Sequence, residues 1–348
     1  MAKRKSGGLL NRHRSITSAK KLSAPKGIKP QQARQLIRRF HILQKNKHSI
    51  LKKISKDYKK CDHELTESNY KEVLSSTKEW RKFYIANADP ESQTLPSSSS
   101  ATDIIKIDSG ITIPQLFSQL GKIDAEIEKR GGLEAYQSAS IHGQDSNRGG
   151  DSSKKLIEWL NQSPYNAVIH SQSKEEKKLS ALEIGCLNPA NFISTSGIFA
   201  NVVKIDLNSQ SQQILQQNFM ERPLPANDSE RFNLISCSLV LNFVPTPLER
   251  GEMLRRLTKF LLPPTPNSMS SLFFVLPLPC LENSRYIDTT IFESMMSDLG
   301  FKKVLSYQAT KLIYYLFDWE GKIKSNIKYS KKQCYEGSKR NNFCIVLE

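Results

Sequence analysis

Hydrophobic residues recur along this chain with two different periods. Between Pro30 and Ile54 they return every three or four positions, which predicts one or two amphipathic helices. Pro30 marks the expected start, because the first residue of a helix needs no N–H. Further helices are predicted over 70–85 and 114–129, the second ending at Gly131-Gly132. On the first helix we expect these basic residues to face water: Arg34, Arg38, Arg39, Lys45 and Lys52.

After Asp151 short apolar runs alternate with helical segments. The predicted strands are 181–184, 202–205, 234–240, 272–278, 312–317 and 343–347. The clearest helical patterns between them are 248–261 and 291–299. Such alternation predicts an α/β fold, with a mostly parallel, doubly wound sheet and helices on both faces. No helical stretch separates the last two strands, so we expect them to form a hairpin at the sheet edge.

The pattern divides the chain into three parts. Residues 1–27 are rich in Ser, Gly and Lys without periodicity and are expected to be a disordered basic tail. Residues 28–150 form a mainly helical, basic region that contains a Ser-rich linker at 92–103. Residues 151–348 form the sheet domain.

Positive charge is concentrated at the N-terminus. Residues 1–60 hold 19 Lys or Arg and one acid, Asp57, so their net charge is +18. The whole chain carries +17, and the residues after position 60 therefore carry −1. A basic arm of this kind binds nucleic acid or acts as a nuclear import signal, although it could also be a solvated tail that aids solubility. The cysteines are scattered, which argues against a metal site or a disulfide framework. We expect an intracellular protein without a membrane span or a secretory signal.

The sharpest local signal is a strand that runs into a glycine turn, Leu182-Glu183-Ile184-Gly185. Asp206 follows 21 residues after Gly185, at the end of the next predicted strand. A carboxylate at this spacing is placed to accept both hydroxyls of a ribose. The alternative is that Gly185 is only a turn residue and Asp206 only a helix cap.

The loop after Gly185 bears on the choice of nucleoside cofactor. A dinucleotide needs several backbone N–H groups around its pyrophosphate and therefore a glycine-rich loop. Residues 185–191 contain one glycine. S-adenosylmethionine has no phosphate, so one glycine suffices for close approach, and the loop favours this cofactor over NAD.

Two Asn-Phe pairs follow later strands. Asn218 could pair with the edge of the adenine ring of the cofactor while Phe219 stacks on it, or the two could be a turn residue and a core residue. Asn242 and Phe243 follow the fourth strand, whose carboxyl end faces the transferred group in this kind of sheet. They are the predicted catalytic pair, which would hold a flipped base by its edge and its ring plane. The alternative for Asn242 is a helix cap in a plain turn.

Two further features leave alternatives open. The Gly-rich polar segment 131–154 could be a loop over the cofactor, with Arg148 on the cofactor carboxylate, or an interdomain hinge. Cys280 follows the fifth strand and could attack C6 of a pyrimidine. Nothing around Cys280 in the sequence indicates a lowered thiol pKa, so this route to 5-methylcytosine is disfavoured.

Several stretches, in one order along the chain, resemble the fungal large-subunit (25S) ribosomal RNA adenine-N1 methyltransferases. They are 131–137, 148–154, 181–186, 204–207, 218–224, 236–245, 250–256 and 341–347. The resemblance implies a Rossmann-like class I methyltransferase fold, S-adenosyl-L-methionine as methyl donor, and N1-methylation of one adenine in large-subunit rRNA. It also implies that the protein is located in the nucleolus, within the nucleus. The cofactor positions of the family carry over to Gly185 and Asp206. Asn218 stands where an Asp is expected, so cofactor affinity is expected to change while the fold does not.

The implied reaction needs little acid–base chemistry. Adenine N1 has an in-plane lone pair, so the enzyme mainly places an unpaired base against the methyl group. We expect Asn242 and Phe243 to do this, in a pocket without a nearby lysine, because the sulfonium is positive. The expected partner is large-subunit rRNA or a pre-ribosomal particle. The domain also resembles an animal S-adenosylmethionine sensor, so a non-catalytic sensor or a ribosome-assembly factor remains an alternative.

Overall fold

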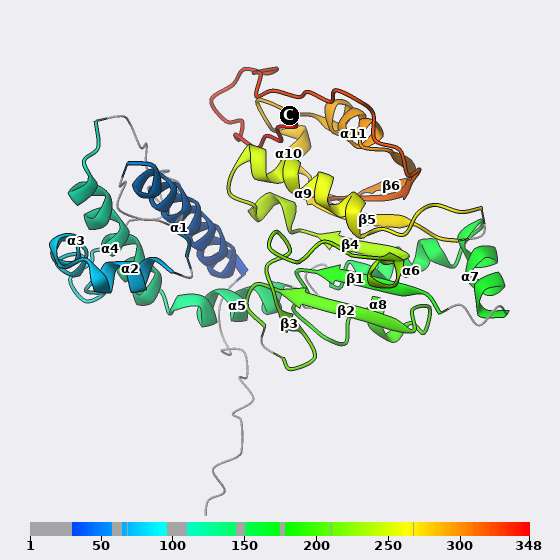
Figure 1. The fold of residues 1–348 in the computed structure, drawn as a ribbon, viewed down its shortest axis with the longest axis horizontal. Helices are drawn as coiled ribbons and strands as arrows, with labels where there is room; N and C mark the ends of the chain where they lie inside the picture. The colour runs from blue at the N-terminus through cyan, green and yellow to red at the C-terminus, as the bar shows by residue number, and fades with distance from the viewer. Residues whose placement is uncertain are drawn as a thin grey trace, which may run out of the picture.

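A seven-stranded sheet forms the centre of the larger part of the molecule (Figure 1). Its strand order is β3-β2-β1-β4-β5-β7-β6, and all neighbouring pairs are parallel except the two pairs that involve β7. The strands are β1 Ser180–Ile184, β2 Asn201–Asp206, β3 Leu215–Gln216, β4 Leu234–Ser238, β5 Ser271–Pro277, β6 Phe301–Gln308 and β7 Leu312–Trp319. This computed structural model describes residues 30–57, 65–67, 69–95, 110–143, 150–174, 178–209, 211–266 and 268–348.

Helices cover both faces of the sheet, which confirms the predicted α/β fold. Side chains of β1 alternate between the faces: Leu182 and Ile184 join the core under α9 and α11, and Ala181 joins the core under α6 and α7. The helices of this domain are α6 Ser153–Leu160, α7 Tyr165–Lys174, α8 Phe192–Thr195, α9 Pro247–Phe260, α10 Pro279–Glu282 and α11 Thr289–Asp298. The 3-10 helices η2 Asp228–Glu230 and η3 Leu241–Phe243 also lie in this domain.

The edge hairpin exists, but it joins β6 and β7 rather than residues 312–317 and 343–347. The sequence pattern missed β6 because a β-bulge between Lys303 and Leu305 breaks the alternation of buried and exposed residues. β6 is the edge strand of the sheet, next to β7. Most of its side chains are exposed, so the segment shows no strong apolar pattern.

Residues 343–347 form no strand of the sheet, contrary to the prediction. They are apolar because they pack against α9. The buried guanidinium of Arg250 donates to the carbonyls of Val244 at 3.0 Å, Pro245 at 3.1 Å and Cys344 at 2.7 Å. It also lies 4.8 Å from the centroid of the Phe343 ring. A Cβ at Gly251 would collide with the Val346 carbonyl oxygen, so glycine permits this close packing.

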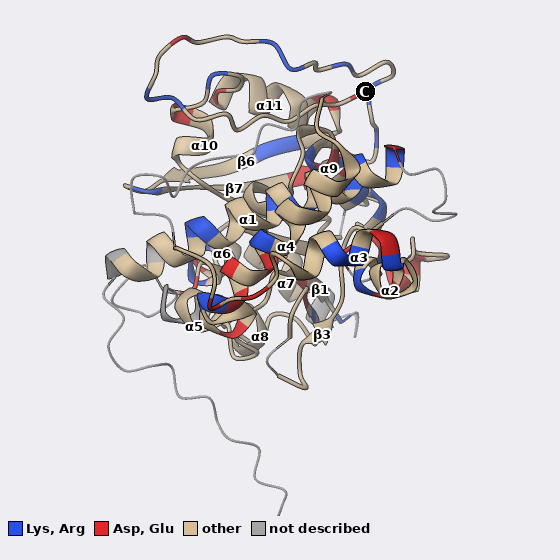
Figure 2. Ribbon diagram, turned by 90° about the vertical axis from the view of Figure 1, so that its left-hand side faces the viewer, with Lys and Arg blue, Asp and Glu red and all other residues tan. Residues whose placement is uncertain are grey.

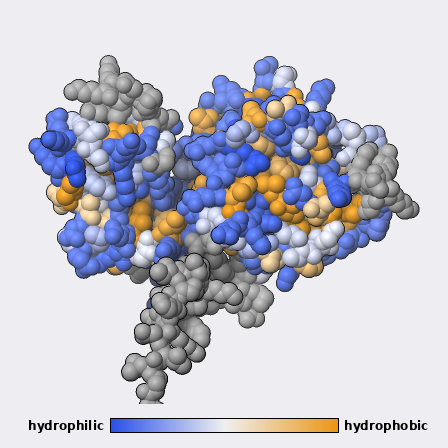
Figure 3. Space-filling model, turned by 60° about the horizontal axis from the view of Figure 1, so that its bottom comes forward, coloured by the Kyte–Doolittle hydropathy of each residue, from blue (hydrophilic) through white to orange (hydrophobic). Residues whose placement is uncertain are grey.

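The N-terminal helices form a separate lobe beside the sheet domain (Figure 1). They are α1 Pro30–Asp57, α2 Tyr70–Ser76, α3 Lys78–Ile85, α4 Ile113–Lys129 and α5 Gly132–Gly143. The predicted single helix over 70–85 is divided at Thr77. Apolar residues of α1, α2 and α4 share one core, including Ile50, Leu74 and Leu120. On the face seen in Figure 3, the surface of this lobe is mostly hydrophilic, whereas hydrophobic side chains gather over the sheet domain.

The polar face of α1 lies partly against protein, so the expectation that its basic residues all face water is wrong. Arg39 is buried and forms a bidentate ion pair with Glu126 on α4, at 2.8 and 2.7 Å. Arg130 donates to the same carboxylate at 2.7 Å. Burial alone would raise the pKa of Glu126, but the hydrogen bonds from both arginines hold it below its ordinary value. Arg38 and Lys52 are exposed as predicted.

The segment that follows α4 is a helix where the sequence predicted a polar loop. Gly131 and Gly132 have positive φ angles of 88° and 63°, which end α4 and turn the chain into α5. Gln137, on α5, donates to the backbone carbonyl of Asn208 beyond β2, so α5 packs on the sheet domain. The tail 1–27, most of the linker 92–103 and residues 144–149 lie outside the described residues, so the domain boundaries remain predictions.

Candidate active site

The turn after β1 closes tightly around Gly185. The backbone N–H groups of Gly185 and Cys186 donate to the Ile205 carbonyl at 2.9 and 3.1 Å. Gly185 has a φ of +75°, and a Cβ there would lie 2.5 Å from Cγ2 of Val240. Glycine is therefore required both by backbone conformation and by space. The bare turn brings the carboxyl ends of β1 and β4 together.

Asp206 ends β2, directly after the residue that accepts the N–H of Gly185. Its Oδ1 accepts the Asn208 N–H at 2.8 Å, and Oδ2 has no donor among the described residues. Burial raises the pKa of Asp206 above its ordinary value. A half-buried carboxylate with one free oxygen suits the hydroxyls of a ribose, and a turn without a side chain suits close passage of a ligand. These two residues fit S-adenosylmethionine.

The Asn218-Phe219 pair is divided between surface and core. Phe219 is 4% exposed, with its ring centroid 5.2 Å from that of Phe260 on α9, so it cannot stack on adenine as predicted. β3 ends at Gln216, and the chain then turns beneath α9. Apolar side chains of the core surround the Phe219 ring there. The Asn218 side chain closes that turn: Oδ1 accepts the Met220 N–H at 2.9 Å. A contact between Asn218 and the cofactor stays a prediction.

Asn242 lies in η3, just beyond the carboxyl end of β4. The preceding Leu239 has a φ of +58°, a conformation that costs a non-glycine residue about 1–2 kcal/mol and is concentrated at functional sites. The amide oxygen of Asn242 is buried and has no hydrogen-bond partner among the described residues. An unpaired buried acceptor is unfavourable by about 1–3 kcal/mol, and a ligand that brought a donor to this oxygen would relieve the cost.

Phe243 is covered on one side by the N-terminal lobe. The His41 ring, on α1, stacks on the Phe243 ring with centroids 3.7 Å apart and an interplanar angle of 15°. Tyr136, on α5, meets His41 edge-on at 5.0 Å and stacks on Phe40 at 4.4 Å. Burial, with the charge of Lys45 nearby, lowers the pKa of His41 to about 3, so its imidazole is neutral at physiological pH. Phe243 itself remains 37% exposed.

Lys45 also reaches this site, so the expectation of a pocket without a nearby lysine is wrong. Its Nζ donates to the Asn242 carbonyl oxygen at 3.4 Å. Burial, and then repulsion from Arg250, lowers the pKa of Lys45 to about 8. Sequence reasoning missed His41 and Lys45 because their period places them on a solvated face, and nothing local to α1 shows which lobe it docks against.

Glu183 is a third residue that sequence reasoning missed, although it belongs to the strand motif Leu182-Glu183-Ile184-Gly185. It is buried in β1, and its Oε1 accepts from Nδ2 of Asn191 at 2.6 Å, while Oε2 has no partner among the described residues. Burial raises the pKa of Glu183 to about 7, against the opposing effect of the Asn191 hydrogen bond. A carboxylate in an otherwise apolar strand is the signal that could have identified it.

Cys280 is not activated as a nucleophile. Burial raises the pKa of its thiol to about 11, in spite of the opposing charges of Arg250 and Lys45. A thiol with a raised pKa holds little thiolate at neutral pH, which agrees with the disfavoured pyrimidine route.

Three further expectations concern Arg148, a metal site and a membrane span. Arg148, the predicted partner of the cofactor carboxylate, lies outside the described residues. The part of the chain that the structure describes has no cluster of three His, Cys, Asp or Glu side chains suited to a metal ion. None of its helices is both long enough and apolar enough to cross a membrane.

The sheet order with its antiparallel β7, the bare turn at Gly185 and the carboxylate of Asp206 define the class of protein. It is a class I S-adenosylmethionine-dependent methyltransferase. The family described as "25S rRNA (adenine(2142)-N(1))-methyltransferase, Bmt2" matches residues 121–345, and this chain belongs to that family.

Relatives of known description agree with the assignment. A Saccharomyces cerevisiae protein named "25S rRNA (adenine(2142)-N(1))-methyltransferase" is 36% identical over 357 residues, which cover 100% of both chains. A Schizosaccharomyces pombe "25S rRNA adenine-N(1) methyltransferase" is 41% identical over 227 residues, covering 65% of this chain and 81% of its own.

Among solved structures, the N-methyltransferase NodS of Bradyrhizobium japonicum, in complex with S-adenosyl-l-homocysteine, aligns at 16% identity. The alignment covers 46% of this chain and 89% of that one, with a TM-score of 0.29.

Proposed function

We propose that this chain transfers a methyl group from S-adenosylmethionine to N1 of one adenine in 25S rRNA. The observation that carries the proposal is the unpaired amide oxygen of Asn242, which lies at the sheet edge that also holds Gly185 and Asp206. Family membership supplies the substrate, and the family description numbers the adenine 2142.

Each residue of the site then has a limited task. S-adenosylmethionine, when bound, supplies an electrophilic methyl group. Asp206 would hold the ribose hydroxyls, and Gly185 would let the ligand pass the β1 turn. Neither residue takes part in the chemical step.

The target base needs placement rather than deprotonation. Adenine N1 attacks with its own lone pair, while the amide oxygen of Asn242 can accept a hydrogen bond from the exocyclic N6 amino group on the same edge. That bond would distinguish adenine from guanine, whose corresponding group is a carbonyl oxygen. The neutral His41 ring, stacked on Phe243, adds no positive charge to the approach of a cationic donor.

We further propose that the substrate is a pre-ribosomal particle and that the protein acts in the nucleolus. The basic arm of residues 1–60, with its charge of +18, supports both, since such an arm suits RNA contact and nuclear import.

The proposal is tested with the purified full-length chain, radiolabelled cofactor and 25S rRNA from a strain that lacks the modification. We expect label in one adenine, located by mapping of modified bases. Asn242→Ala should lower turnover on RNA with little change in cofactor affinity, whereas Asn242→Gln should recover part of the activity because it restores the amide. Cofactor binding in calorimetry without any labelled RNA would refute the enzyme assignment and support a non-catalytic sensor.

A further inference from the structure

A second concentration of positive charge lies near the other end of the chain, in residues 321–340, here called the C-terminal strap. It holds seven Lys or Arg and one acid, Glu336, and therefore carries +6. Residues 1–60 carry +18 and the whole chain +17, so everything outside these two segments carries −7. The positive charge of the strap thus stands apart from an otherwise acidic remainder.

Six of the seven cations of the strap are lysines, and their side chains face solvent. Its lysines are all exposed: Lys322, Lys324, Lys328, Lys331, Lys332 and Lys339. Among the described residues only Lys324 has a carboxylate partner, Asp298 at 3.1 Å. Figure 2 shows Lys and Arg at intervals along the strap where it crosses α11. Unpaired like charges repel one another, and a polyanion relieves this repulsion.

The strap has a fixed path although it contains no helix or sheet strand. The Arg285 carbonyl accepts the N–H groups of Cys334 and Tyr335 at 2.8 and 3.1 Å. The Arg285 guanidinium in turn donates to the Gly337 carbonyl at 2.9 Å. Anchors of this kind order the strap before a ligand arrives, which lowers the entropy cost of binding.

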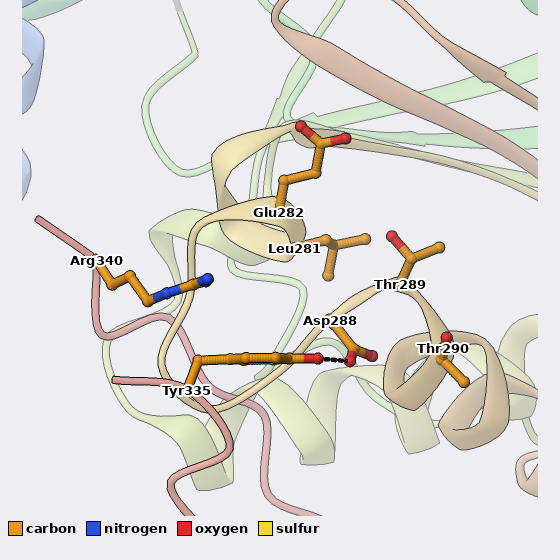
Figure 4. Close-up of a pocket in the computed structure, with 7 residues that line it drawn as sticks. All are labelled: Leu281, Glu282, Asp288, Thr289, Thr290, Tyr335 and Arg340. Atoms are coloured by element: carbon orange, nitrogen blue, oxygen red, sulfur yellow. Dashed lines mark hydrogen bonds between the residues drawn. The ribbon is translucent and has the colours of Figure 1, made fainter. Parts of the chain in front are cut away.

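Two cations of the strap lie against aromatic rings. Lys331 lies 4.8 Å from the centroid of the Tyr286 ring, and Arg340 lies 4.7 Å from that of Tyr335. Tyr335 and Arg340 form one side of a shallow pocket, with Thr289 and Thr290 of α11 on the other (Figure 4). The Tyr335 hydroxyl donates to Asp288, which fixes the ring. Cations beside exposed aromatic faces are typical of surfaces that bind single-stranded nucleic acid, through phosphates and stacked bases.

The strap adjoins the sheet edge that holds the candidate active site. Asn341, the residue that follows the strap, donates from Nδ2 to the Pro279 carbonyl at 2.6 Å, and Pro279 begins α10 two residues after the end of β5. The charge of Lys45 acts on the neighbouring Cys280, where it opposes the rise in the thiol pKa. Lys45 is also the residue that donates to the Asn242 carbonyl. An RNA strand that places a base at Asn242 can therefore continue onto the strap.

We propose that the C-terminal strap binds the single-stranded RNA that flanks the target adenine, through its phosphates and one base stacked at Tyr335. The inference rests on the proposed function, whose RNA substrate it extends to a defined surface. An acidic protein would satisfy the lysines but would have no use for the aromatic faces between them.

The test uses the full-length chain with a triple variant, Lys331→Gln, Lys332→Gln and Lys339→Gln. Its matched control changes three exposed lysines elsewhere by the same total charge: Lys71→Gln, Lys78→Gln and Lys259→Gln. Affinity for a 25S rRNA fragment is measured by fluorescence anisotropy over a series of salt concentrations. Losing three phosphate contacts should reduce the slope of log affinity against log salt by about 2, because each contact to a single strand contributes about 0.7.

We expect the strap variant to raise the KM for RNA at least tenfold at low salt while kcat at saturating RNA and cofactor affinity stay within about twofold of wild type. Tyr335→Leu should weaken binding with an unchanged salt slope, since base stacking on an aromatic ring involves no ions. Equal effects of the strap and control variants would overturn the inference, as would equal competition by polyglutamate and RNA of the same charge. Wild-type protein that methylates no RNA would instead refute the proposed function.

Discussion

The imidazole ring of His41 stacks on the phenyl ring of Phe243, so a helix of the N-terminal lobe forms one wall of the candidate active site. Lys45, one helical turn further along α1, binds the carbonyl of the adjacent Asn242. The lobe is therefore expected to take part in methyl transfer and not merely to carry a basic arm.

Removing the His41 ring should uncouple the lobe from the site. We expect His41→Ala to lower kcat on RNA about 10–100-fold, because the lost stacking leaves a cavity and lets α1 shift by the small displacement that reactions of this kind do not tolerate. His41→Phe keeps a ring at this position and removes the unpaired buried Nε2, so it should unfold at an equal or higher temperature. Turnover by His41→Ala at the wild-type rate would show that the wall is dispensable.

Acid should destabilise the protein partly through His41. The pKa is lowered from 6.5 in the unfolded chain to about 3 in the fold, so between these values only the unfolded state binds the proton. The free energy of unfolding therefore falls as pH drops below 6.5, by at most about 1.4 kcal/mol per pH unit from this group. Urea unfolding at pH 7.5 and 5.5 should show a smaller acid loss in His41→Phe than in wild type. Identical losses would mean that His41 is protonated in the fold.

A side chain at residue 185 should close the cofactor site. Gly185→Ala places a Cβ 2.5 Å from Cγ2 of Val240 and forces alanine to a φ of +75°, a backbone cost of about 1–2 kcal/mol. We expect at least a tenfold loss of S-adenosylmethionine affinity in calorimetry, and no measurable binding by Gly185→Arg. Adding Val240→Ala to Gly185→Ala removes the clash but not the backbone strain, so it should recover part of the affinity. No recovery would argue that the steric contact with Val240 is not the cause.

The carboxylate of Asp206 should contribute to affinity through charge. Asp206→Asn keeps the size of the side chain but replaces a charge-assisted acceptor, and such hydrogen bonds contribute about 1.5–3 kcal/mol each. We therefore expect a 10–100-fold weaker Kd for S-adenosylmethionine with little change in thermal stability. Asn218→Ala is the comparison, because its amide oxygen already accepts the Met220 N–H, and it should change the Kd less. An unaltered Kd in Asp206→Asn would remove the ribose contact from the proposed site.

The sequence predicted those parts of the site that depend on one strand and the turn after it. Gly185 and Asp206 stand at strand ends with a fixed spacing, and parallel strands bring their carboxyl ends together whatever the helices do. The fate of Phe219 depends on how α9 packs above it, which its own neighbours in sequence do not encode.

Long-range docking explains the other differences. His41, Lys45 and Arg39 lie on a polar face of α1 that finds partners in Phe243, Asn242 and Glu126, residues 87 to more than 190 positions away. The pair Gly131-Gly132 is typical of a loop and so hides α5 in the sequence, although in the structure it forms a sharp junction between two helices. Charged residues indicate a solvent-exposed face, and glycines indicate a turn. Tertiary packing determines whether that face binds another element and what the turn connects.

Arg250 has a consequence for how substrate and site communicate. One buried guanidinium holds both Cys344, a few residues beyond the C-terminal strap, and the carbonyls of Val244 and Pro245, directly after Phe243. Arg250 therefore links the two segments directly, and we expect RNA bound at the strap to restrict the motion of the loop that holds Asn242 and Phe243. Cofactor and RNA are accordingly expected to bind cooperatively, each arriving at a centre that the other has already stiffened.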